Sequence, residues 1–164
     1  MAITLRPVAD SDRPLLFDLY ASTRQDELAR VPWTAAQKHA FLEMQFSGQN
    51  EGYRATHPDA THEMICVDEC AVGRLYLNRD SEGLHIMDIT IAPESRNAGI
   101  GSNVLERLLS EADREGKRVT IYVESFNPSL RLFQRLGFRT ASVDGFLVLL
   151  ERPHKGAAAT GDAQ

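Results

Sequence analysis

The segment that decides the fold of this 164-residue chain is Arg96-Asn97-Ala98-Gly99-Ile100-Gly101-Ser102. An apolar run over residues 84–92 precedes it, and Pro93 ends that run. An amphipathic run follows, and its apolar positions are Val104, Leu105, Leu108 and Leu109. The pattern predicts a strand, a tight glycine turn and the start of a helix, in that order.

A strand, a glycine turn and a helix in this order form a cradle for an anion. Glycines let the backbone approach a ligand closely, and the first N–H groups of a helix have no acceptor within the helix. The helix dipole adds partial positive charge at the same end. A phosphate or pyrophosphate is therefore the expected ligand, which indicates a phosphorylated small molecule as partner.

Two common phosphate motifs do not match this turn. A Walker-type loop requires Gly-Lys followed by Ser or Thr, and the turn contains no lysine. A dinucleotide fingerprint requires a third glycine, whereas Gly99-Ile100-Gly101 is followed by Ser102, Asn103 and Val104. The pattern that remains is Arg-x-x-Gly-x-Gly after a strand.

A second group of residues lies further along the chain: a strand-like run over 121–123, Asn127 before a short helix-like run, and Gly137-Phe138. Together with Arg-x-x-Gly-x-Gly, these residues resemble the GNAT family of N-acetyltransferases. The glycine turn is similar to the family's acetyl-coenzyme A binding motif. The later residues are similar to its next strand, its asparagine-bearing turn and the helix that follows. The resemblance covers about residues 62–152, and the earlier part matches only in the order of its elements.

The resemblance implies an α/β fold with a mixed, mostly antiparallel sheet of six to seven strands. About four helices flank the sheet, and a splayed pair of parallel strands lies in its middle. One acetyltransferase domain is expected over residues 1–153. The tail over 154–164 has nothing to bury, so we expect it to be disordered.

Periodicity predicts further strands at 3–6, 63–67, 72–77, 119–123, 138–143 and 146–150. A helix capped by Ser11 or Asp12 is expected to run to about Thr23, and another to begin after Thr34. The segment 24–33 reads as a loop, and 47–61 carries little pattern.

The composition indicates an ordinary globular protein, with 43% hydrophobic and 25% charged residues. No apolar run approaches the ~20 residues of a transmembrane helix, and the N-terminus lacks the features of a signal peptide, so the cytoplasm is the expected compartment. The net charge of −5 argues against nucleic acid or an anionic membrane as partner. Cys66 and Cys70 are too few for a disulfide framework, and no zinc spacing occurs, so no metal is expected.

The resemblance implies direct transfer of an acetyl group from acetyl-coenzyme A to an amine in a ternary complex. It implies that the pantetheine arm pairs with the main chain of 89–91 and that the pyrophosphate lies on the N–H groups of 97–102. Asn127 would bond the pantetheine or reach the helix turn beneath it. The expected cofactor-binding residues are Ile89, Thr90, Ile91, Arg96, Asn97, Ala98, Gly99, Ile100, Gly101, Ser102, Asn127 and Phe133.

Three positions depart from the family pattern. Asn97-Ala98 stands where many members have Gly-Lys or Gly-Arg, so Arg96 is the only cation inside the loop. Phe133 replaces a frequent tyrosine, which is the usual candidate acid for the leaving thiolate. We expect its ring to pack against the cofactor arm. Tyr122 stands where some members have a glutamate that acts as general base.

His85 and Tyr122 are the candidate catalytic residues. Alternation along the strand places His85 on one face with Ile89 and Ile91. Some family members have a catalytic histidine or glutamate at this position, acting through water, and imidazole titrates in the range that suits a general base. The alternative is a solvated histidine at the start of a strand. Tyr122 is a proton relay or acid, or else an aromatic residue on the pleated surface.

The acceptor site is expected in the segment 24–33. Asp26 and Glu27 would orient a cationic amine, Arg24 would bind a substrate carboxylate, and Trp33 would form a wall. A solvated loop is the alternative. The acceptor itself stays open among a peptide amino terminus, a lysine, a polyamine, an amino acid and an aminoglycoside, and the chain is expected to be a monomer or a homodimer.

Two other functions stay open from the sequence. The absence of the usual tyrosine and glutamate leaves a non-catalytic sensor that binds acyl-coenzyme A with the same fold. A nucleotide-binding domain unrelated to the family would bind ATP or NAD in preference to coenzyme A.

Overall fold

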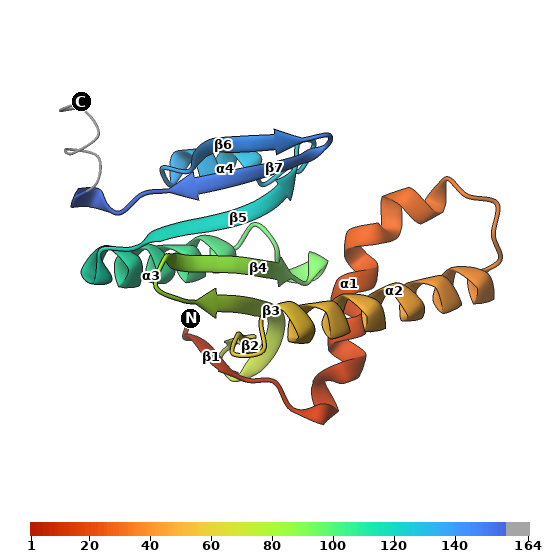
Figure 1. Ribbon diagram of the computed structural model, residues 1–164. Helices are drawn as coiled ribbons and strands as arrows, with labels where there is room; N and C mark the ends of the chain where they lie inside the picture. The colour runs from red at the N-terminus through yellow and green to blue at the C-terminus, as the bar shows by residue number, and fades with distance from the viewer. Residues whose placement is uncertain (157–164) are drawn as a thin grey trace. The chain divides into compact units, whose positions relative to one another are not determined.

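The computed structural model describes residues 1–156 (Figure 1). Its elements are β1 (Ile3–Pro7), the 3-10 turn η1 (Asp10–Asp12), α1 (Arg13–Ala29), α2 (Ala35–Thr56), β2 (Thr61–Val67), β3 (Cys70–Arg79), β4 (Gly83–Ile91), the 3-10 turn η2 (Pro93–Ser95), α3 (Ile100–Glu115), β5 (Arg118–Glu124), α4 (Leu130–Arg135), β6 (Arg139–Asp144) and β7 (Leu147–Arg152). Most of the tail that the sequence predicts to be disordered lies outside the described residues, so that prediction is not tested.

The strands form one seven-stranded sheet in the order β1-β2-β3-β4-β5-β7-β6. β1 pairs with β2, β5 with β7, and β6 with β7, all antiparallel. β4 and β5 are parallel, and their register runs from Gly83↔Arg118 to Ile86↔Ile121. The predicted α/β fold, with a parallel pair in a mixed sheet, is confirmed.

The chain forms two compact units, Met1–Tyr76 with Ile89–Ala98 and Leu77–Asp88 with Gly99–Gln164. In the first unit, α1 and α2 contact each other (Figure 1). Leu19, Phe46 and Met64 are buried in an apolar core. In the second unit, α3 contacts β5. The expectation of one domain over 1–153 stays a prediction.

Helices α1 and α2 are both longer than the sequence predicts. α1 continues to Ala29, so the predicted loop over 24–33 is wrong for residues 24–29, which are helical. α2 continues to Thr56, through much of the segment that carried little pattern. In the last turns of α1 only Leu28 is buried, so the apolar periodicity there is too weak to predict a helix.

The beginnings of these helices differ in how they are capped. Thr34 caps α2 as predicted: its Oγ1 accepts a hydrogen bond from Gln37 N at 3.1 Å, and Gln37 Oε1 accepts one from Thr34 N at 2.9 Å. Asp12 is the N-cap residue of α1, but its carboxylate makes no capping bond. It accepts bonds of 2.7 and 2.8 Å from Arg6 and one of 2.8 Å from Ala9 N. These bonds lower the pKa of Asp12 to about 2, and the hydrogen bonding from Arg6 has the largest effect.

Tight turns join two pairs of neighbouring strands. Asp68 and Glu69 join β2 to β3 with φ values of 48° and 73°, as a two-residue hairpin turn requires. Gly145, at φ 61°, follows β6 in the hairpin with β7. The register shifts between Thr140 and Ser142, which marks a bulge in β6.

Helix α3 is amphipathic as predicted. The four apolar positions that the sequence indicates are all buried, and they are Val104, Leu105, Leu108 and Leu109. Gly116 ends the helix in the left-handed conformation, at φ 66°. Within residues 1–156, no helix combines the length and the apolar character that crossing a membrane would need.

Candidate active site

The loop that opens α3 has the backbone of an anion-binding turn. Asn97 and Gly99 are both left-handed, with φ of 63° and 79°, and Gly99 is the N-cap residue. Asn103 N donates the first bond of the helix to Gly99 O at 3.0 Å. The N–H groups of residues 100–102 therefore precede the first helical bond and lie at the positive end of the helix dipole.

Asn97 lies at a position where the resemblance would place a glycine, and it still allows the loop to keep this shape. Asparagine adopts the left-handed region several times more often than most residues, so it tolerates a φ of 63°. A Cβ on Gly99 would meet nothing within 4 Å, so glycine is required there by its backbone conformation and not by lack of space.

The guanidinium of Arg96 binds groups of the protein itself. Its Nε donates to Ile91 O at 3.0 Å, and one terminal nitrogen lies 3.4 Å from Ser22 Oγ. The side chain therefore ties the glycine loop to the end of β4 and to α1. The main-chain oxygen of Ile91, which is expected to face the pantetheine arm, therefore already accepts a hydrogen bond from Arg96.

The end of β4 lies against β3 on one side. Ala92 N donates to Val72 O at 2.8 Å, and a Cβ on Gly73 would lie 2.5 Å from Thr90 O. Backbone groups alternate along a strand, so those of Ile89 and Ile91 point to the opposite edge. The sequence does not indicate a role for Gly73. The close approach of another backbone to a glycine inside a strand can be recognised only when the neighbouring strand is known.

The two candidate catalytic residues lie together. The rings of His85 on β4 and Tyr122 on β5 are 5.7 Å apart between centroids, with their planes at 78°. Tyr122 is 52% exposed, so its ring keeps a solvent-facing side. The structure thus brings together two residues that the sequence proposed separately.

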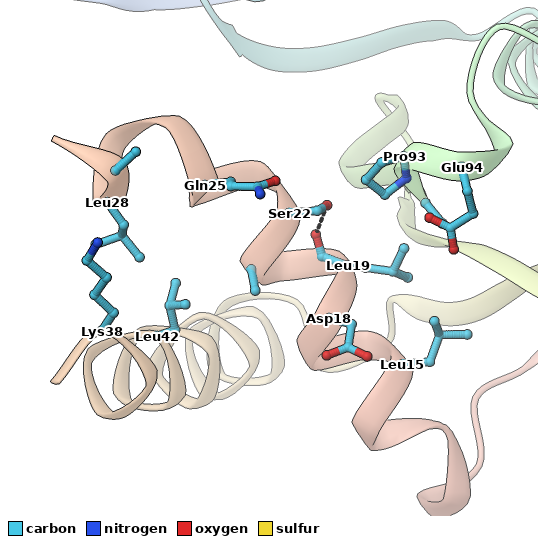
Figure 2. A pocket seen from close by; sticks show the side chains of 13 residues that line it. Leu15, Asp18, Leu19, Ser22, Gln25, Leu28, Lys38, Leu42, Pro93 and Glu94 are labelled. Carbon is cyan, nitrogen blue, oxygen red and sulfur yellow. Dashed lines mark hydrogen bonds between the residues drawn. The ribbon is translucent and has the colours of Figure 1, made fainter. Parts of the chain in front are cut away.

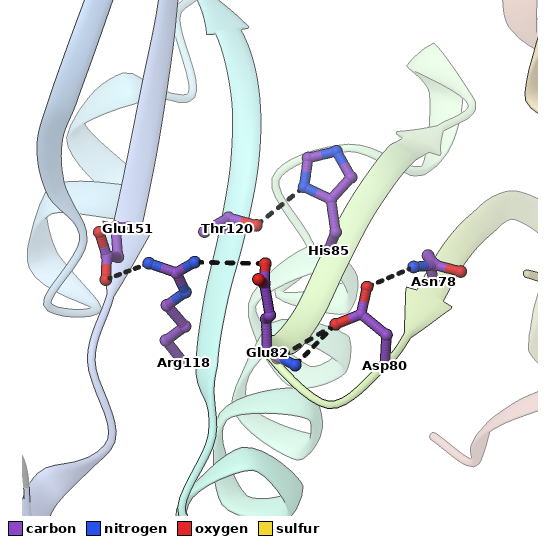
Figure 3. A network of polar contacts seen from close by, with 8 residues as sticks. Asn78, Asp80, Glu82, His85, Arg118, Thr120 and Glu151 are labelled. Carbon is purple, nitrogen blue, oxygen red and sulfur yellow. Dashed lines mark hydrogen bonds and ion pairs between the residues drawn. The ribbon is translucent and has the colours of Figure 1, made fainter. Parts of the chain in front are cut away.

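A third residue, Thr120, contacts the histidine. His85 Nδ1 lies 2.8 Å from Thr120 Oγ1 (Figure 3). His85 and Thr120 are also register partners in the parallel pair, so the pairing of β4 with β5 itself fixes the contact. The sequence missed Thr120, because nothing local shows which residue of β5 lies opposite His85.

Polar contacts hold the start of β4 next to His85 (Figure 3). Asp80 Oδ1 accepts bonds from Glu82 N at 2.9 Å and from Gly83 N at 3.2 Å. Arg118 on β5 lies 3.8 Å from Glu82 and 3.3 Å from Glu151 on β7. This network joins the turn before β4 to the neighbouring strands.

Asn127 and Phe133 lie around α4. Asn127 Oδ1 accepts a hydrogen bond from Ser129 N at 2.8 Å, which places its side chain on the turn that begins the helix. This is one of the two roles that the resemblance implies for it. Phe133 is 3% exposed and packs edge-on against Phe138, 5.4 Å away between ring centroids. Its contact with the cofactor arm stays a prediction.

The four predicted acceptor residues lie in the last turns of α1 and just after it. Arg24 and Glu27 lie on α1 and pair with each other at 3.1 Å, and the Arg24 guanidinium lies 5.6 Å from the centre of the Tyr20 ring. Asp26 is exposed on the same helix. Trp33 follows the helix, is 41% exposed and packs edge-on against Phe41 at 5.1 Å. Their role in acceptor binding stays a prediction.

A cavity of about 630 Å³ lies in the first unit, between α1, the first turns of α2 and residues 92–94 (Figure 2). Leucines form much of its wall, and Asp18, Lys38 and Glu94 bring charge to it. None of the predicted acceptor residues lines it. Among residues 1–156, no group of three or more histidine, cysteine, aspartate or glutamate side chains is arranged to hold a metal ion.

A strand, a left-handed turn and a helix that presents its first N–H groups follow one another in this α/β fold. The chain belongs to the GNAT family of acetyltransferases, whose family model matches residues 16–138.

Solved structures of acetyltransferases share the fold. The PaiA N-acetyltransferase of Thermoplasma acidophilum, in complex with coenzyme A, has a TM-score of 0.70 at 15% identity, over 94% of this chain and 100% of that one. A GNAT acetyltransferase of Elizabethkingia anophelis with acetyl-CoA bound has a TM-score of 0.60 at 17% identity, over 92% and 97%. The ribosomal-protein-S18-alanine N-acetyltransferase of Escherichia coli has 0.61 at 16%, over 93% and 94%. At these identities the likeness shows the fold alone.

Proposed function

We propose that this chain moves an acetyl group from acetyl-coenzyme A to a primary amine by direct transfer. The observation that carries the proposal is the backbone of the glycine loop, which presents the N–H groups of residues 100–102 at the start of a long helix. Membership of the family supports the same conclusion. When bound, acetyl-coenzyme A supplies a thioester whose C–S bond breaks as the amide C–N bond forms.

The loop residues fit the phosphate groups of this cofactor. Backbone N–H groups over 97–102 would hold the pyrophosphate, with the helix dipole adding to the attraction. Ile89 and Ile91 would offer main-chain groups to the pantetheine arm, since their backbone points away from β3. Arg96 would act mainly by holding the loop to β4, because its Nε already donates to Ile91 O.

His85 would accept the proton that the amine must lose before its nitrogen can attack. In this proposal Nδ1 carries a proton and donates a hydrogen bond to Thr120 Oγ1, and the lone pair stays on Nε2. Thr120 then accepts a hydrogen bond from the neutral imidazole and from the imidazolium alike, so the contact of 2.8 Å persists while His85 gains and loses a proton. Thr120 is thus a positioning residue, acting through His85.

Tyr122 would donate a proton to the departing thiolate, directly or through water. An ordinary thiol has a pKa of about 8.5, so a thiolate leaves readily near neutral pH and needs little help from an acid. Phe133, which has no proton to donate, would therefore not prevent transfer. A cytoplasmic location and a monomeric or dimeric state stay predictions.

Thermal unfolding with and without ligand tests the cofactor site. Acetyl-coenzyme A at about 100 times its Kd should stabilise the fold by about 2.7 kcal/mol. Gly99→Asp or Gly101→Asp should abolish this shift, because a carboxylate in the loop repels the pyrophosphate. Gly48→Asp, on α2, is the control, since a Cβ there meets nothing within 4 Å. Loop variants that shift like the wild type, or a larger shift with ATP or NAD, would contradict the assignment.

Release of free thiol from acetyl-coenzyme A in the presence of mixed amines tests the transfer. We expect release with at least one amine. If acetyl-coenzyme A stabilises the protein but no amine produces thiol, the chain is a sensor that binds the cofactor without reacting.

A further inference from the structure

The cavity beside α1 is lined by residues along much of that helix, and we call it the helix groove. Its wall runs along α1 from Leu15 to Ala29 and includes Leu42 on α2 (Figure 2). Leucine, alanine and proline side chains make up most of the wall. An apolar wall of this extent suits a ligand with an apolar body.

The charged residues of the helix groove lie toward opposite ends. Figure 2 shows Asp18 near Leu15 and Glu94 beside Pro93, whereas Lys38 lies at the other end with Leu28. Within the described residues, the side chains of Asp18, Lys38 and Glu94 take part in no hydrogen bond or ion pair. They are therefore available to a ligand.

The length of the groove follows from α1. Asp18 and Leu28 are separated by ten residues of helix, and a rise of about 1.5 Å per residue makes this about 15 Å. An extended peptide spans about 3.3 Å per residue, so about four residues cover the distance.

We infer that the helix groove binds an elongated amine whose ammonium lies by Asp18 and Glu94 and whose anionic group lies by Lys38. The apolar body between these ends lies along the leucines, as it would for a short apolar peptide with a free amino terminus. A polyamine places a positive charge beside Lys38, and an aminoglycoside lacks an apolar body. The inference names the class of amine that accepts the acetyl group. The transfer to this amine rests on the proposed function, whereas the binding of the amine in the groove does not.

Calorimetric titration without cofactor tests the charges at both ends. The probes are the peptide Ala-Leu-Ala-Leu with a free carboxylate, the same peptide with a C-terminal amide, its N-acetylated form, and spermidine. The free peptide should bind most tightly, and loss of either end charge should weaken binding about two- to fivefold, as expected for exposed ion pairs. Spermidine should bind more weakly than the free peptide.

Charge variants connect these preferences to the groove. Lys38→Glu should reverse the order, so that the amide binds more tightly than the acid. Asp18→Asn should reduce the penalty of N-acetylation. Asp59→Asn and Lys155→Glu are matched controls, since neither residue lines the groove. If Lys38→Glu leaves the ratio of acid to amide unchanged, or spermidine binds more tightly than the free peptide, the inference is wrong.

Thiol release separates this inference from the proposed function. If the peptides bind with the expected charge preferences but release no thiol from acetyl-coenzyme A, the groove is a binding site and the transfer to this class of amine fails. If another amine releases thiol while the peptides do not bind, the acetyl transfer stands and the inference about the groove is overturned.

Discussion

His85 and Thr120 face each other across the parallel strands β4 and β5, with 2.8 Å between Nδ1 and Oγ1. A hydroxyl in this place can accept a hydrogen bond from Nδ1–H or donate one to a bare Nδ1, and the proposed mechanism uses the first arrangement. The contact is built into the strand register, so it does not depend on a mobile loop.

Thr120→Val should lower kcat about tenfold, a fraction of the 10²–10⁴-fold that general acid–base catalysis contributes. The methyl group keeps the shape of the side chain but gives His85 no acceptor. KM for acetyl-coenzyme A should stay close to the wild-type value. Thr120→Ser should restore most of the rate, and nitrogen NMR should show the Nδ1–H tautomer in wild type and Ser variant. An unchanged tautomer in Thr120→Val would remove the positioning role.

His85→Ala should lower turnover by about 10²-fold or more at neutral pH, because the amine then loses its proton to solvent alone. The loss should shrink at higher pH, where more of the amine is already deprotonated. The measurement is the dependence of kcat/KM on pH. A variant whose profile matches the wild type would return His85 to the role of a surface histidine.

Two glycines should respond in opposite directions to alanine. Gly48 lies within α2 with nothing within 4 Å of a Cβ, so Gly48→Ala should raise the free energy of unfolding by about 0.5–1 kcal/mol. Gly99 is equally open but has φ of 79°, so Gly99→Ala should lower it by about 1–2 kcal/mol. Denaturant unfolding measures both. Equal effects would mean that the loop adopts another backbone conformation.

Asp12 should make stability depend on acid pH. Its pKa of about 2 lies below the ordinary aspartate value of 3.8, so its pairing with Arg6 stabilises the fold fully above about pH 4 and is lost as the pH falls toward 2. The difference in unfolding free energy between wild type and Asp12→Asn should therefore be constant near neutrality and decrease below pH 4.

Asp10→Asn, in the same short turn, is the matched control for Asp12. It should change stability less, since the carboxylate of Asp10 forms no ion pair with Arg6. A difference between wild type and Asp12→Asn that stays the same from pH 5 to pH 3 would show that the ion pair with Arg6 does not stabilise the fold.

The elements that the sequence predicts well are those with strong local signals. The four buried apolar residues of α3 and the cap at Thr34 leave a pattern within a few positions. The last turns of α1 do not, because Leu28 is their only buried residue.

The candidate site divides in the same way. The glycine loop could be predicted, since its conformation depends on neighbouring residues. Thr120 could not, because its place opposite His85 comes from the register of two strands that are distant in sequence. The helix groove was missed for a related reason: Asp18, Lys38 and Glu94 come from three separate segments, and only packing brings them to one cavity.

The bulge in β6 has a consequence for how copies of this chain behave when crowded. In the described part of the sheet, β6 is an outer strand, and all six of its residues are exposed. A regular strand in that position would offer a template on which another chain could add, the first step of aggregation. The register shift between Thr140 and Ser142 interrupts the even spacing of its backbone groups. An incoming strand could match only one half of the edge at a time, so the irregularity protects the protein against edge-to-edge growth.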